Sequence, residues 1–108
     1  MKKLTEKTCK PCEGGTPPLT SEQAKKYLVD VPGWKIDGNK ITKEYKFDNF
    51  KKSLSFVNKI GGIAEKEGHH PDITFGWGYV KITLTTHAVK GLSENDFILA
   101  AKINEIRN

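Results

Sequence analysis

The sequence predicts an α+β fold, a two-layer sandwich in which a four-stranded antiparallel sheet carries its helices on one face. Apolar and polar residues alternate over 79–86, which is typical of a strand with one buried face. Three other stretches, near 21–31, 50–67 and 94–107, space their apolar residues as helices do. The resulting order is helix, strand, strand, helix, strand, strand, helix. Strands joined as hairpins favour two layers with the helices segregated to one side.

The first helix and the first hairpin have clear boundary signals. Thr20-Ser21-Glu22-Gln23 reads as a capping box, and Pro32-Gly33 is expected to end the helix. A strand starts at Trp34, and Asp37-Gly38-Asn39 predicts a tight turn. The return strand covers about 40–47, and the residues that share its apolar face are Ile41, Tyr45 and Phe47.

A long second helix follows, with Asp48 or Asn49 as its N-cap. The Gly61-Gly62 pair costs helix propensity, on the order of 1 kcal/mol per glycine relative to alanine. We therefore expect either close packing against a neighbour or a kink at this pair. Gly68 is well placed as the residue that ends the helix. An apolar stripe with helical spacing comprises Phe50, Leu54, Val57, Gly61 and Ala64, flanked by Phe56, Ile60 and Ile63.

The second hairpin and the last helix complete the domain. A short strand near 73–75, a turn at Gly76-Trp77-Gly78 and a strand over 79–86 form the hairpin. Ser93-Glu94-Asn95-Asp96 is a second capping box, and Phe97 can close a hydrophobic staple with Leu92. The last helix is expected to reach Arg107. In the second strand Val80, Ile82 and Leu84 face one way, and Lys81, Thr83, Thr85 and His87 face the other.

Composition limits the classes of function. The 108 residues are enough for one domain, which we place at 19–108 behind an N-terminal arm at 1–18. We find no apolar run long enough to cross a bilayer and no secretory signal, so we expect a cytoplasmic protein with no membrane partner. The net charge is +5, yet the lysines are scattered and Arg107 is the one arginine. We interpret this charge as a solvated surface, with no nucleic-acid partner.

Cys9 and Cys12 form a single Cys-x-x-Cys pair in the arm. A structural zinc site needs about four ligands, and no second pair lies at a matching spacing. The alternatives that stay open are two reduced cysteines in a flexible arm, a local disulfide, and a metal shared between subunits.

The three histidines lie in two neighbouring parts of the chain. His69 and His70 follow the long helix and precede Pro71, and the nearly equal arms of the second hairpin bring His87 back level with them. Histidine has an ordinary pKa close to neutrality, so it can give and take protons. Glu65 lies four residues before His69 and would reach that ring on a continuing helix. Pro71 pushes His70 into an extended conformation.

The residues alone leave three interpretations of this cluster open. It is a general acid–base site, a solvated helix end where a protonated histidine suits the dipole, or a metal site formed by His69, His70 and His87. Adjacent histidines seldom bind one ion, which weighs against the metal. Asp96 occupies the N3 position of a capping box, and this structural role is sufficient to explain it.

A long spaced signature runs through the second half of the chain. It comprises Glu65-x-x-x-His69-His70-Pro71, the aromatic Trp77, His87, and Gly91-Leu92-Ser93-x-x-Asp96. This signature closely resembles the pterin-4a-carbinolamine dehydratase family, and the resemblance extends from Leu19 to nearly the end. The lead Cys9-x-x-Cys12-Glu13-Gly14-Gly15 is also similar to that of many bacterial-type members.

The resemblance implies dehydration of a 4a-hydroxytetrahydropterin to the quinonoid dihydropterin, which recycles the cofactor of aromatic amino-acid hydroxylases. It implies an α+β fold, a homodimer or homotetramer, no metal and no cofactor, and it allows a hydroxylase of the same pathway as a partner. The alternative is a non-catalytic dimerisation or assembly cofactor for another protein, because some family members act in this way.

Carried over by position, the catalytic residues are His69, His70 and His87. The resemblance makes His69 and His87 proton-transfer groups and makes His70 the partner of the departing hydroxyl. Members of the family often carry Tyr-Asn where this chain has Trp77-Gly78, so the pocket wall and the pterin preference stay open. The residues assigned to orientation or substrate binding are Glu65, Asp96, Pro71 and Trp77.

Overall fold

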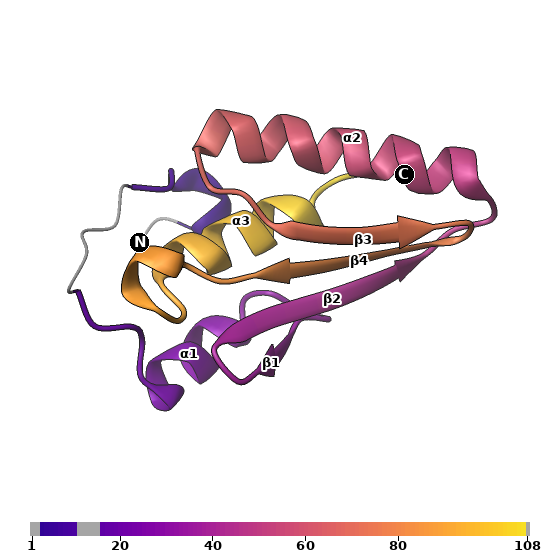
Figure 1. Cartoon of the computed structure of the whole chain (residues 1–108). Coiled ribbons are helices and arrows are strands. Elements are labelled where there is room, and N and C mark those ends of the chain that lie inside the picture. Colours follow the sequence, from indigo (N-terminus) through magenta and orange to yellow (C-terminus); the bar gives the residue numbers. More distant parts are fainter. Residues whose placement is uncertain (1–2, 11–15, 108) are drawn as a thin grey trace.

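The computed structural model describes residues 3–10 and 16–107. Figure 1 shows the elements in the predicted order. They are α1 (Ser21–Leu28), β1 (Lys35–Asp37), β2 (Lys40–Lys46), α2 (Phe50–Glu67), β3 (Asp72–Gly76), β4 (Tyr79–Leu84) and α3 (Glu94–Asn104), with two short 3₁₀ turns, η1 (Leu4–Glu6) and η2 (His87–Val89). The strand order in the sheet is β1-β2-β4-β3, and all neighbours are antiparallel. The α+β class is confirmed.

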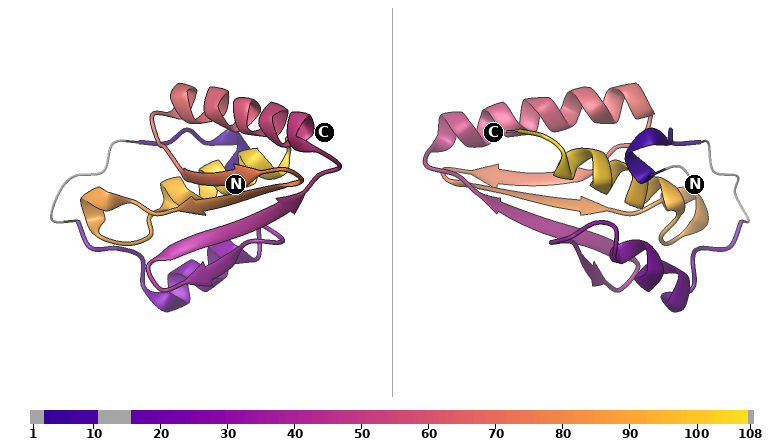
Figure 2. Two further views of the ribbon diagram at one scale, coloured as in Figure 1. Left: turned by 45° about the vertical axis from the view of Figure 1, so that its right-hand side comes forward. Right: turned by 180° about the vertical axis from the view of Figure 1, so that it is seen from behind.

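The sheet has one apolar face and one polar face. Val80, Ile82 and Leu84 of β4 are fully buried on the apolar face, as their alternation predicts. Seen from behind in Figure 2, α3 and α1 lie in front of the sheet and α2 runs along its β3 side. Because α2 packs on β3, β4 and α3, the core lies between the sheet and the helices. No helix in the described part of the chain is long and apolar enough to span a membrane.

The predicted helix starts are confirmed. Thr20 and Gln23 form one capping box, Ser93 and Asp96 form the other, and the side chain of Asn49 caps α2. Two predicted ends are wrong. The last helix ends at Asn104 rather than near Arg107, and β4 ends at Leu84, so that His87 lies in η2 instead of at the end of a strand.

The long helix α2 buries a different stripe from the one that begins at Phe50. Its buried residues are Ser53, Phe56, Ile60 and Ala64, whereas Phe50 and Leu54 are 47% and 40% exposed. The helix continues without a break through Gly61 and Gly62, and a Cβ at either position would meet no atom within 4 Å. Neither a break in α2 nor close packing within the described chain accounts for this pair.

Candidate active site

Gly68 turns the chain at the end of α2 and so positions both adjacent histidines. It has φ 66° and ψ 25°, a left-handed conformation that glycine adopts without a Cβ clash. The backbone N–H groups of Gly68 and His69 both donate to the carbonyl of Ala64. The helix therefore stops before His69, whose side chain points away from the α2 helical path.

His69 forms a pair with Asp96, at the start of α3. The His69 Nε2 lies 2.7 Å from the Asp96 Oδ1. Asp96 is fully buried, and the side chain of His69 is 12% exposed. A carboxylate oxygen can only accept, so Nε2 carries the proton and Nδ1 holds the lone pair. The arrangement sets the tautomer of His69 and prepares its Nδ1 to accept a proton.

The second carboxylate oxygen of Asp96 supports the fold around this pair. Its Oδ2 accepts from the backbone N–H of Ser93 at 3.0 Å and from the hydroxyl of Thr86 at 2.8 Å. The hydroxyls of Thr86 and Ser93 are themselves 2.7 Å apart. Asp96 is therefore both the N3 residue of a capping box and the partner of His69, and the two roles use different oxygens.

Glu65 contacts His70 and not His69, which corrects the expectation from helical spacing. Its Oε2 lies 2.5 Å from the Nε2 of His70, and both side chains are well exposed. The expectation fails because Gly68 ends the helix before His69. Solvent screens an exposed pair of this kind, so its contribution to stability is small.

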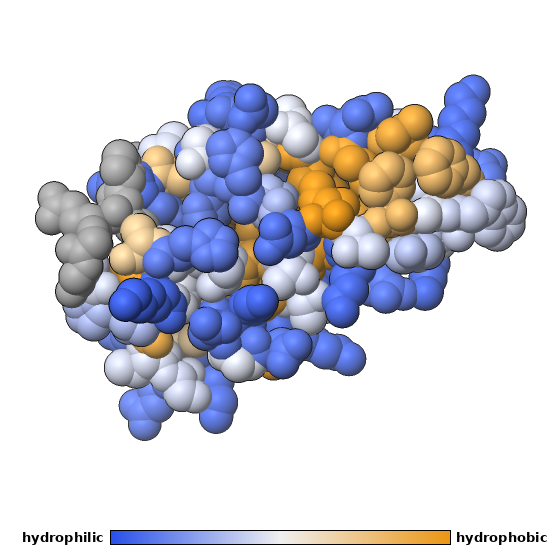
Figure 3. Space-filling model, viewed as in Figure 1, coloured by the Kyte–Doolittle hydropathy of each residue, from blue (hydrophilic) through white to orange (hydrophobic). Residues whose placement is uncertain are grey.

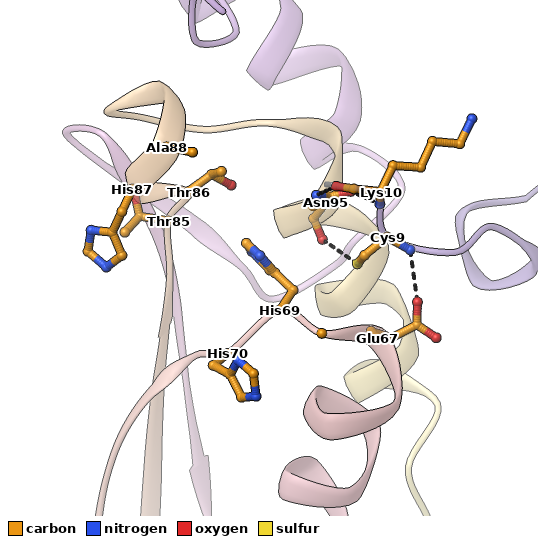
Figure 4. A pocket seen from close by; sticks show the side chains of 11 residues that line it. Cys9, Lys10, Glu67, His69, His70, Thr85, Thr86, His87, Ala88 and Asn95 are labelled. Atoms are coloured by element: carbon orange, nitrogen blue, oxygen red, sulfur yellow. Dashed lines mark hydrogen bonds between the residues drawn. The ribbon is translucent and has the colours of Figure 1, made fainter. Parts of the chain in front are cut away.

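The three histidines line one pocket of about 560 Å³ (Figure 4). In the β3–β4 pairing Asp72 lies opposite Thr83, which brings the segment after Leu84 back beside the end of α2. His87 lies across the pocket from Glu67, with His69 between them. The side chain of His87 is exposed, and within the described residues its ring makes no hydrogen bond. Its two nitrogens are therefore available to a ligand. A pocket of this volume suits a small bicyclic ligand.

Other residues complete the pocket wall. Cys9 is half-buried, and burial raises the pKa of its thiol to about 12. The proposals for a Cys9–Cys12 disulfide or a shared metal involve Cys12, which lies outside the described residues. Among the residues described, no three His, Cys, Asp or Glu side chains converge in a way that could hold a metal ion. The remaining lining residues are Lys10, Glu67, Gly68, Thr85, Thr86, Ala88 and Asn95.

Comparison with known proteins identifies the family. The model of the pterin 4 alpha carbinolamine dehydratase family matches residues 17–106. The chain belongs to this family. Relatives provisionally named as pterin-4-alpha-carbinolamine dehydratases cover nearly the same length. The protein of Methylococcus capsulatus is 50% identical over 95% of this chain and 92% of its own, and that of Alkaliphilus metalliredigens is 52% identical over 97% and 96%.

Solved structures of dehydratase-like proteins share the fold. A protein of Brucella melitensis described as a transcriptional coactivator/pterin dehydratase has a TM-score of 0.76 and 34% identity, covering 81% of this chain and 95% of its own. A pterin dehydratase-like protein described as a RuBisCO assembly factor in the alpha-carboxysome has a TM-score of 0.55 and 25% identity, covering 66% and 82%. The two descriptions differ in function, so the dehydratase fold alone does not determine activity.

The structure brings together most of the residues that the dehydratase resemblance assigned to the site. His69, His70 and His87 line the pocket, Asp96 lies behind His69, and Glu65 contacts His70. Pro71 is half-buried between His70 and β3. Trp77 lies in the turn at the other end of the β3–β4 hairpin, 71% exposed, and is not among the residues that line this pocket.

Sequence reasoning missed Thr86 and Glu67 as parts of the site. Thr86 was placed in a strand, and Glu67 in a helix, where each has an ordinary structural role. The sequence does contain a signal for Glu67. This acidic residue lies near a helix end and two positions before His69, within reach of the same pocket. The roles of both depend on partners from other segments.

Proposed function

We propose that this chain dehydrates a 4a-hydroxytetrahydropterin to the quinonoid dihydropterin by histidine acid–base catalysis. The observation that carries the proposal is the convergence of three histidines on one pocket, with the buried Asp96 behind His69. Membership of the dehydratase family supplies the class of substrate. The product would return to the cofactor cycle of an aromatic amino-acid hydroxylase.

The proposed reaction needs one acid and one base. The C4a–O bond breaks and the hydroxyl leaves as water, after taking a proton from the acid. The base removes the proton from the adjacent ring nitrogen, and the electrons of that N–H bond form the new C=N bond. The net change is the loss of one water, with no oxidation or reduction. Each positioned proton transfer contributes typically 10²–10⁴-fold to the rate.

The proposed roles follow from the partners of each ring. His69 acts as the base, because Asp96 accepts from its Nε2 and stabilises the imidazolium formed when Nδ1 takes a proton. His87 lies across the pocket and acts as the acid for the hydroxyl. His70, oriented by Glu65, binds the departing hydroxyl.

We expect His69→Ala and His87→Ala each to lower kcat by about 10²–10⁴-fold. The measurement is an assay coupled to an aromatic amino-acid hydroxylase that follows quinonoid dihydropterin formation above the spontaneous rate. Trp77→Ala is the control, because this exposed aromatic does not line the pocket. A wild-type rate equal to the spontaneous rate would contradict the enzymatic proposal.

A second candidate is a non-catalytic role as a dimerisation or assembly cofactor for another protein. The descriptions of the two structural neighbours, a coactivator and an assembly factor, motivate it. The histidine variants separate the two functions. A partner-dependent phenotype that survives His69→Ala and His87→Ala favours assembly, and its loss together with dehydratase activity favours catalysis.

We also propose that the chain forms a homo-oligomer through an apolar face made of Phe50, Leu54, Val57, Gly61 and Phe75. Phe50 and Leu54 are strongly exposed, and Phe50 packs on Phe75 with ring centroids 5.7 Å apart. Figure 3 shows apolar side chains gathered over α2 and β3. The open space beside Gly61 and Gly62 would admit the helix of a second copy, and β3 is an edge strand. Exposed apolar patches of this kind often mark interfaces.

Leu54→Lys is expected to shift the protein toward the 12.1 kDa monomer, because an unpaired charge would be buried at the interface. Light scattering after size exclusion measures the mass. Val29→Lys is the matched control, because Val29 is 81% exposed at the end of α1, away from this face. A monomeric wild type, or an oligomer unchanged by Leu54→Lys, would contradict the proposal.

A further inference from the structure

Residues 3–10, the N-terminal strap, pack onto the domain that carries the histidines. Leu4 of η1 is buried in the core cluster, and η1 packs against α3. The Nζ of Lys7 lies 2.7 Å from Glu94, which also accepts from the hydroxyl of Tyr27. The family match covers residues 17–106, so the strap lies outside it.

The strap is tied to the end of α2 through Glu67. The backbone N–H of Cys9 donates to the Oε1 of Glu67 at 2.9 Å, and Lys102 of α3 donates to the Oε2 at 2.8 Å. The Glu67 side chain is 4% exposed. The bonds from Lys102 and from Cys9 hold the pKa of Glu67 below its usual value. The ionised carboxylate thus joins the strap, α2 and α3 at one point.

The strap is tied to the start of α3 through Asn95. The Oδ1 of Asn95 accepts from the backbone N–H of Lys10 at 3.0 Å, and its Nδ2 donates to the carbonyl of Lys10 at 2.6 Å. The Sγ of Cys9 lies 3.6 Å from the carbonyl oxygen of Asn95. A side-chain amide that bonds both backbone groups of one residue holds that residue in a single orientation.

These ties lie directly beside the His69–Asp96 pair. Glu67 precedes His69 by two residues, and Asn95 precedes Asp96 by one. Figure 4 shows Cys9 and Lys10 on the far side of His69 from His87, next to Glu67 and Asn95. Both Cys9 and Lys10 line the pocket. The strap therefore bridges the two segments that carry the pair and forms the wall opposite His87.

We propose that the N-terminal strap is a positioning element of the active site: it holds the His69 segment against the Asp96 segment and closes the pocket with Cys9 and Lys10, so that a bound pterin contacts this wall. This inference rests on the proposed pterin site. A productive geometry tolerates little misplacement, so loosening the strap should affect turnover without removing any catalytic side chain.

Footprinting of Cys9 tests the wall. Wild-type protein is alkylated at alkaline pH over a long time course, because burial raises the pKa of Cys9 and leaves little of the reactive thiolate. The reaction is run with and without 7,8-dihydrobiopterin, and site-resolved mass spectrometry separates Cys9 from Cys12. Binding of the probe is measured independently by isothermal titration calorimetry. At about ten times the dissociation constant, the pterin should slow the alkylation of Cys9 roughly tenfold by occupancy alone. Binding without protection of Cys9 would overturn the inference and leave the proposed function intact, whereas no binding would count against the proposed function itself.

The double variant Leu4→Ala/Lys7→Ala tests positioning, because it removes two anchors of the strap and neither residue lines the pocket. We expect protection of Cys9 to be lost and kcat/KM to fall roughly tenfold, with the histidine pair still present. The control Lys25→Ala/Leu28→Ala changes an exposed lysine and a half-buried leucine of α1 in the same way. Equal loss of kcat/KM and of protection in both variants would reduce the strap to a general stabiliser and contradict the proposal.

Discussion

Asp96→Asn is expected to lower kcat for the proposed dehydration by roughly 10²–10⁴-fold. Three donors converge on the two carboxylate oxygens of Asp96. They are the Nε2–H of His69, the hydroxyl of Thr86 and the backbone N–H of Ser93. The amide of asparagine has a single oxygen, so it cannot accept from His69 on one side and from Thr86 and Ser93 on the other. If its NH₂ faces His69, the ring must place its lone pair on Nε2 and its proton on Nδ1, which removes the base. The hydroxylase-coupled assay measures the loss.

The control for this prediction is Ser93→Ala, which removes the N-cap hydroxyl of α3 and leaves the 2.7 Å contact between His69 and Asp96 in place. We expect it to lower stability by about 0.5–2 kcal/mol and to retain most of the activity. Thermal melts of both variants separate misfolding from lost chemistry. A folded Asp96→Asn protein with wild-type kcat would show that the pair takes no part in turnover.

Phe97→Ala is expected to lower the free energy of unfolding by about 3–5 kcal/mol. Phe97 is fully buried at the start of α3, and its ring stacks on Tyr27 with centroids 5.2 Å apart. A domain of this size has roughly 5–15 kcal/mol of stability, so the loss is a large fraction of the total. Urea unfolding at equilibrium measures it.

Trp77→Ala is the comparison for this prediction, since Trp77 is a large aromatic that is 71% exposed in the β3–β4 turn. We expect it to cost less than about 1 kcal/mol, because little apolar area returns to water. Similar losses in both variants would contradict the prediction, because the burial of Phe97 would then add no stability beyond that of an exposed aromatic.

Local signals in the sequence predicted the helix starts and the turns. The capping boxes at Thr20 and Ser93 satisfy backbone donors within four residues of themselves, so they need no tertiary partner. Gly68 ends α2 for a similar reason, because its left-handed conformation depends on its own missing Cβ. The hairpin turn at Gly38-Asn39 is equally local, with Asp37 paired to Lys40 across it.

Element ends were predicted less well because tertiary contacts decide them. The bridge between Thr86 and Gly91 pulls the chain into η2 directly after β4, so His87 leaves the sheet. Near the end of α3, the side-chain oxygen of Asn104 accepts from Trp34, Lys43 and Tyr45. Apolar periodicity contains no information on such contacts. It also could not distinguish the buried stripe of α2 from the exposed one at Phe50 and Leu54.

The sequence by itself determined the fold class, the three histidines and their place around one hairpin, because these depend on spacing and on local conformation. Tertiary structure alone decided which acid serves which histidine. His69 and Asp96 are 27 residues apart, and Cys9 and Glu67 are 58 apart. Helical spacing assigned Glu65 to His69, but Gly68 stops the helix and sends His69 toward α3. Partners at such separations meet only when the whole core has packed, so no local pattern records them.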